Sequence, residues 1–96
     1  MPAVMDTRRS MPPKKPINTK RYGGRVAARL RALREERGWL VGKLTEEINR
    51  QLPKAERVAV STVHHWDNGG RKVDPDMYPI LARVFGLTVA EFLPPS

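Results

Sequence analysis

The sequence has no cysteine, no long hydrophobic run and few aromatic residues. Without cysteine there are no disulfides, thiol nucleophiles or thiolate metal sites, so stability depends on packing. No segment approaches the roughly 20 apolar residues that span a bilayer, and the N-terminus lacks the apolar core of a signal peptide. A chain of 96 residues allows one small domain without a large buried active site. We expect a cytoplasmic protein.

Features of an enzyme are also scarce. There is no glycine-rich phosphate loop, and the only two histidines, His64 and His65, are adjacent in the sequence. On a helix adjacent side chains point about 100° apart, which suits a shared metal poorly. The sequence therefore predicts no enzymatic activity, no cofactor and no metal.

The charge is strongly biased toward one sign. Lys and Arg number 18 against 10 Asp and Glu, which gives a net charge of +8 and a pI near 10.6. Such a balance indicates an anionic partner, with nucleic acid favoured over a membrane surface.

Residues 1–22 hold six of the basic residues and one acid, Asp6, or +5 of the total +8. Four prolines and the lack of apolar periodicity predict a mobile, disordered arm ahead of a domain over 23–96. The arm either lies along DNA phosphates or is a solvated tail. Its candidate backbone contacts are Lys14, Lys15, Lys20 and Arg21.

The remaining pattern is all-α and predicts five short helices, over 24–37, 40–52, 59–68, 75–85 and 88–93. Apolar residues recur at helical spacing, and the ends are marked by Gly38, Pro53, Gly69 and Gly86. Asp74 is a predicted N-cap, and Thr88 with Glu91 forms a predicted capping box. We expect the arginines of the first helix to lie in solvent.

The short helix near 61–68 has two distinct faces. Val63 and Trp66 are three residues apart and share one face, while Ser61, His64, His65 and Asn68 point elsewhere. A helix with a narrow apolar face and outward polar groups is suited to a groove that displays hydrogen-bonding edges. An ordinary amphipathic surface helix is the alternative.

The segments 30–39, 61–69, 71–75 and 81–93 together resemble the Cro and phage-repressor helix-turn-helix family, also called the XRE family. The resemblance covers residues 24–93. It implies a lambda-repressor-like domain whose third helix enters the major groove while the second crosses the backbone. It also implies a sequence-specific regulator of transcription, a repressor associated with the nucleoid, that pairs as a homodimer on double-stranded DNA.

The resemblance assigns roles residue by residue. Val60, Ser61 and His65 would meet base edges, with Thr62 and His64 at the groove margin, while Asn68, Arg71 and Lys72 would contact phosphates. Lys43 could replace the polar phosphate clamp that the family often has where Val41 stands. Val63 and Trp66 would be core.

Two departures from the family pattern affect the groove-binding helix. Residues 49–56 are longer than the family's compact turn, which leaves the angle between helices two and three open. Ala59 stands where a capping Ser or Thr is usual, so the helix could begin at Ser61 instead.

Phe92 and Leu93 are a candidate dimer contact, or alternatively part of the monomer's own core. The competing function is an antitoxin, which would bind a toxin protein through the N-terminal arm and also regulate its own operon.

Overall fold

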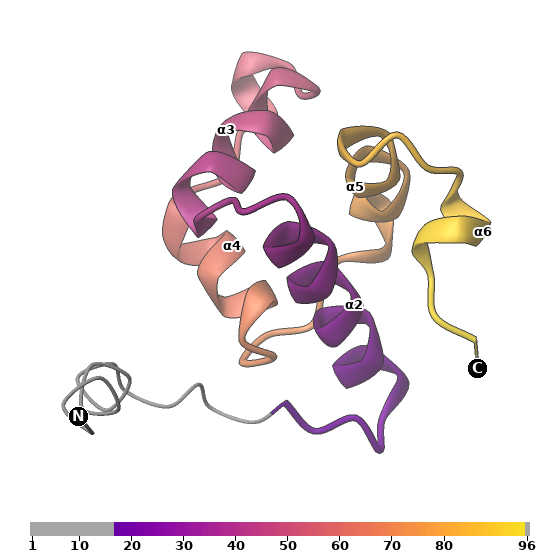
Figure 1. The fold of residues 1–96 in the computed structure, drawn as a ribbon. Helices are drawn as coiled ribbons and strands as arrows, with labels where there is room; N and C mark the ends of the chain where they lie inside the picture. Colours follow the sequence, from indigo (N-terminus) through magenta and orange to yellow (C-terminus); the bar gives the residue numbers. More distant parts are fainter. Residues whose placement is uncertain (1–16, 96) are drawn as a thin grey trace, which may run out of the picture.

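The computed structural model describes residues 17–95, which form five α-helices and two short 3-10 helices and contain no strand (Figure 1). The helices are α2 (Tyr22–Glu36), α3 (Val41–Arg50), α4 (Val60–Asp67), α5 (Tyr78–Val84) and α6 (Val89–Phe92), with η1 (Lys54–Glu56) and η2 (Pro75–Met77) between them. The predicted all-α class is therefore confirmed over this range. None of these helices is long and apolar enough to cross a membrane.

The helices enclose one core, and α4 lies against two of its neighbours. Helix α4 packs on both α2 and α3, while α5 packs on α3 and α6. The side chains of Leu30, Leu44, Ile48, Val63, Leu81 and Phe92 have no exposed surface. Burying a side chain of this size stabilises the fold by roughly 1.5–3 kcal/mol, so a short helix such as α4 is held by its neighbours and not by its own length.

The predicted helix ends are largely confirmed. Gly38 and Gly69 follow α2 and α4 with φ of 69° and 78°, a left-handed conformation that costs glycine no steric penalty. The Thr88 side chain accepts from the Glu91 N–H at 3.1 Å, and Glu91 Oε1 accepts from the Thr88 N–H at 2.9 Å. The capping box is therefore present.

The predicted fourth helix is divided into η2 and α5. Asp74 is the N-cap, because its side chain accepts from the Asp76 N–H at 2.9 Å. Pro79 has no N–H, so it cannot donate to the carbonyl of Pro75 and an α-helix cannot run through that turn. The chain forms a 3-10 turn first, and α5 then begins with Pro79 in its first turn, where no donor is needed.

The second helix is shorter than predicted, and an amide closes the loop that follows it. Helix α3 ends at Arg50, before Leu52. Asn49 Oδ1 accepts from the Val58 N–H at 2.9 Å, and Asn49 Nδ2 donates to the Val58 carbonyl at 3.0 Å. Residues 49–58 therefore form a closed loop whose two ends are held together by the Asn49 side chain.

Tyr22 belongs to the folded part of the chain, although the sequence placed the boundary after it. It is the first residue of α2, it packs against the core, and its hydroxyl donates to the Pro94 carbonyl at 3.0 Å. The N-terminal arm assigned to residues 1–22 is thus shorter by at least this residue, and its residues 1–16 lie outside the described range.

Phe92 lies in the domain's own core, with no exposed surface and its ring 6.3 Å from that of Tyr78. The dimer contact predicted for it is therefore wrong, because a side chain already enclosed in the core beside Tyr78 of α5 offers no area to a partner. Leu93 is half-buried against the same core.

Arg29 and Arg34 of α2 are not fully in solvent as predicted, and Arg37, the residue that follows α2, is exposed but still bonds to the fold. Arg29 donates to the carbonyls of Phe92 at 3.1 Å and Glu91 at 2.9 Å, and so satisfies the end of α6. Arg37 donates to the Phe85 carbonyl at 2.9 Å and covers that ring at 4.8 Å. Arg34 is buried, and its partner lies at the end of α4.

Candidate nucleic-acid interface

Helix α4 separates its residues into two faces, as the sequence predicted. Val63, Trp66 and Asp67 are buried. The outward residues Ser61, His64 and His65 are exposed, as is Val60, of which 50% of the surface is accessible. Thr62 and Asn68 are half-buried at the margins. Four of the predicted DNA contacts therefore share one open surface.

The start of α4 is fixed by the backbone instead of a side chain. Ala59 is the N-cap without a side-chain hydrogen bond, and its carbonyl accepts from the N–H groups of Thr62 at 3.1 Å and Val63 at 3.2 Å. The helix begins at Val60, so the alternative start at Ser61 is wrong by one residue. Val60 and Ser61 are thereby placed in the first turn.

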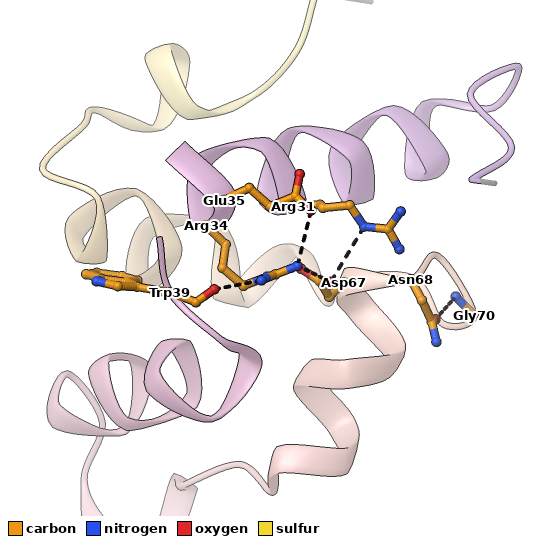
Figure 2. A network of polar contacts seen from close by, with 7 residues as sticks. All are labelled: Arg31, Arg34, Glu35, Trp39, Asp67, Asn68 and Gly70. Carbon is orange, nitrogen blue, oxygen red and sulfur yellow. Dashed lines mark hydrogen bonds and ion pairs between the residues drawn. The ribbon is translucent and has the colours of Figure 1, made fainter. Parts of the chain in front are cut away.

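The other end of α4 is tied to α2 by a buried ion pair (Figure 2). Arg34 Nε lies 2.8 Å from Asp67 Oδ1, and Arg34 Nη2 lies 3.0 Å from Asp67 Oδ2. Arg34 Nη1 also donates to the Trp39 carbonyl at 2.7 Å. This two-pronged geometry fixes direction as well as distance. The carboxylate thus sets how the last turn of α4 lies against α2 and the segment that leads to α3.

A second arginine faces the same carboxylate. Arg31 Nε lies 3.6 Å from Asp67 Oδ2, and this buried nitrogen has no hydrogen-bond partner. Arg31 therefore adds electrostatic attraction without a hydrogen bond. Two guanidinium groups from α2 converge on one carboxylate at the end of α4, as Figure 2 shows.

The turn after α4 is also held by hydrogen bonds. Asn68 Oδ1 accepts from the Gly70 N–H at 2.8 Å, and the His65 carbonyl accepts from Gly70 and Arg71 at 2.9 Å and 3.2 Å. The amide oxygen of Asn68 is thus used within the turn, and Nδ2 is the group left to donate to a phosphate. Arg71 and Lys72 follow this turn, and both are exposed and form no ion pair within residues 17–95.

Lys43 is engaged inside its own helix. Its Nζ lies 2.8 Å from Glu47 Oε2 and 3.8 Å from Glu46 Oε1. The hydrogen bond from Lys43 is the main reason why the pKa of Glu47 lies below its ordinary value. To clamp a phosphate as predicted, Lys43 would have to leave Glu47.

The structure describes two of the four predicted arm contacts. Lys20 and Arg21 are exposed beside the start of α2, where Asn18 Oδ1 accepts from the Lys20 N–H at 3.0 Å. Lys14 and Lys15 lie outside the described residues.

Sequence reasoning missed Arg34 and Asp67, although a signal for both was present. Arg34 is four residues after Leu30, and Asp67 is four residues after Val63, so each lies on the buried stripe of its helix. A basic and an acidic residue on facing buried stripes indicate an ion pair, because a buried charge needs a partner.

The comparisons with known proteins add no relative. No family model, no curated protein and no solved structure matches this chain. Within residues 17–95 no group of three or more His, Asp or Glu side chains could hold a metal ion.

Proposed function

We propose that the protein is a sequence-specific double-stranded DNA-binding regulator of transcription, a repressor, that inserts the outward face of α4 into the major groove. The observation that supports this function best is the structure of α4 itself. Its inner face is anchored by Val63, Trp66 and the Asp67 ion pair, while its outer face presents small polar groups and imidazoles. A rigidly held helix with an unpartnered polar face suits readout of base edges.

The exposed residues suit different edges of the bases. Ser61 can donate to or accept from either base of a pair, and His65 can donate to a purine acceptor. Val60, half of whose surface is exposed, can pack against a thymine methyl group. Because these three residues lie in two successive turns of α4, they would meet neighbouring base pairs.

Exposed cations that form no ion pair within residues 17–95 supply the phosphate contacts. Arg71 and Lys72 follow its last turn, and Lys20 with Arg21 precede α2. Phosphate contacts position a protein on DNA and carry no sequence information, so this division assigns affinity to the cations and specificity to α4.

The protein would act as a two-fold dimer on DNA. One recognition helix covers only a few base pairs, which is too few to define a site in a genome. Two copies on half-sites about 10 bp apart would meet this need. Since Phe92 is enclosed in the monomer, the contact between copies must use other surface, and pairing would occur on DNA. A titration that gives one protein per asymmetric site would contradict this arrangement.

Selection of sequences from a random pool of duplexes tests the proposal directly. We expect enrichment of one two-fold symmetric sequence. With six to ten phosphate contacts, the affinity of the protein for this sequence should fall by a factor of about 10³–10⁵ between 50 and 200 mM salt. Failure to enrich any sequence, or an affinity that does not change with salt, would overturn the proposed function.

Two variants separate readout from positioning. Ser61→Ala should change the selected sequence, whereas Arg71→Gln should weaken binding to every duplex by a similar factor and lower the salt slope. Arg83→Gln is the matched control, because Arg83 is an exposed cation on α5, away from α4.

The antitoxin alternative depends on the N-terminal arm, residues 1–22, of which residues 1–16 lie outside the described range. It stays a prediction from the sequence.

A further inference from the structure

A hollow of about 250 Å³ lies between the start of α2 and the turn that follows α4. It is lined by Asn18, Arg21, Gly23, Gly24, Gly69, Gly70, Arg71 and Lys72. The lining thus combines four glycines with three cationic side chains, and it includes no acidic residue. We call this hollow the basic pocket.

Two distant segments of the chain build the basic pocket through close approaches at glycine. A Cβ placed on Gly69 would lie 3.0 Å from Ile17 Cγ2, and one placed on Gly23 would lie 3.4 Å from Lys72 Cγ. A Cβ on Gly24 would coincide with the carbonyl of Asn18. Residues 17–24 therefore pack directly on residues 69–72, and the side chain of Lys72 lies across the start of α2.

The charges of the basic pocket have no counterpart within residues 17–95. Arg21, Arg71 and Lys72 form no ion pair there, unlike the cations of α3, which lie beside Glu46 and Glu47. The cost of holding three positive charges together falls when an anion binds between them. The side chains of arginine and lysine are suited to the oxygens of a phosphate.

We propose that the basic pocket binds a phosphate group, with Arg21, Arg71 and Lys72 as its ligands. The phosphate can come from the DNA backbone or from a small molecule that bears a phosphate or pyrophosphate group. The site does not require the proposed function, because the pocket is present in the protein without DNA. If DNA supplies the phosphate, the pocket fixes the position of α2 on the backbone beside α4.

The first experiment uses pyrophosphate and the full chain without DNA. Titration of the ¹⁵N-labelled protein should give saturable shifts of the amide signals of Gly23, Gly24, Gly69 and Gly70. In the variant with both Arg71→Gln and Lys72→Gln, binding should weaken at least about tenfold, since two charged hydrogen-bond donors are lost. Arg83→Gln should bind as the unchanged protein does. The three substituted residues, Arg71, Lys72 and Arg83, are exposed, and melting curves check that each variant is folded.

A second arm identifies the source of the phosphate. If a duplex shifts the same four amides and pyrophosphate competes with it, the DNA backbone supplies the phosphate. If pyrophosphate binds and no duplex does, the pocket serves a small molecule. The proposed DNA function then fails, while the pocket proposal stands. If pyrophosphate gives no saturable shift at the four glycines, while a duplex binds and the double variant binds it as Arg83→Gln does, the pocket proposal is overturned and the DNA function stands with its phosphate contacts elsewhere. Shifts spread over the whole surface, without saturation at the four glycines, also overturn it.

Discussion

The two faces of α4 differ in what each contributes to the protein. The inner face is fully enclosed and includes a charged residue, Asp67, whose partners are fixed to within hydrogen-bond distance. The outer face has Ser61 and two histidines, which are exposed and whose side chains form no hydrogen bond, ion pair or ring contact within the described residues. One side of this eight-residue helix thus supplies stability, and the proposed DNA binding belongs to the opposite side.

This separation means that the outer face can change without loss of the fold. A helix of this length is not stable alone in water, so the inner face must supply its order. The outer residues are then free to be chosen for what they bind. Substitutions on the two faces should therefore have opposite signatures. Three variants on α4 measure how complete the separation is, and a fourth, at the cap of α6, gives a local loss for comparison.

The largest loss is expected for Trp66→Ala. Trp66 is 4% exposed and sits between α4 and the rest of the core. Truncation of a buried tryptophan costs about 3–5 kcal/mol, a large share of the roughly 5–15 kcal/mol that a domain possesses. Thermal or urea unfolding should show a severe loss or no folded protein at all. A loss below 1 kcal/mol would mean that the inner face does not hold α4.

Asp67→Ala should cost nearly as much. It leaves the buried Nε and Nη2 of Arg34 without the carboxylate that accepts from both, and breaking a buried ion pair on one side costs about 3–5 kcal/mol. The variant with both Arg34→Leu and Asp67→Leu should recover much of this loss, because two apolar side chains can replace a buried pair. If the double variant is as unstable as the single one, the position of α4 depends on the charges and not on packing.

The first two variants also mark what the sequence could and could not predict. Spacing placed Val63 and Trp66 inside, and the glycines and the capping box marked most helix ends, because these are local rules. Arg34 and Asp67 were missed because their residue types suggest solvent, and only the pairing of two helices makes their burial favourable. Phe92 shows the same limit, since spacing predicts a buried side chain and does not say which surface encloses it.

The residues of the basic pocket were predicted only in part for a related reason. Arg71 and Lys72 adjoin α4 in the sequence and were assigned to phosphates by position. Nothing local indicates that Gly23 and Gly24 lie against them, because that approach depends on how α2 packs on α4. Contacts between segments about fifty residues apart are a property of the whole fold.

Thr88→Ala provides a measure of a smaller, local loss away from α4. The Thr88 hydroxyl caps α6, and removal of such a cap costs about 1 kcal/mol. The hydrogen bond from the Thr88 N–H holds the pKa of Glu91 below its ordinary value, so this contribution is present above pH 4.5 and is lost as the pH falls through the lowered pKa. Alanine keeps this N–H, and only the smaller contribution of the Thr88 side chain to the lowered pKa is removed, so unfolding at pH 7 and at decreasing pH should show the gap between the two proteins narrowing slightly. A gap that is independent of pH would mean that the Thr88 side chain does not act on the Glu91 carboxylate.

The smallest effect on stability is expected for His65→Ala, and it gives the sharpest test of the two faces. His65 is exposed, and only its backbone carbonyl holds the turn after α4, which alanine preserves. Its free energy of unfolding should lie within about 0.5 kcal/mol of the unchanged protein. The sequence selected from random duplexes should nevertheless change at the base pair that His65 meets. The variant should lose about 1–3 kcal/mol of the binding free energy by which the unchanged protein prefers the right base at that position. His64→Ala is the matched control, since the neighbouring imidazole is also exposed and is placed at the groove margin.

A loss of stability in His65→Ala as large as that of Trp66→Ala would mean that the inner and outer faces have been exchanged. An unchanged fold with an unchanged selected sequence would remove His65 from the readout and leave specificity to Val60 and Ser61.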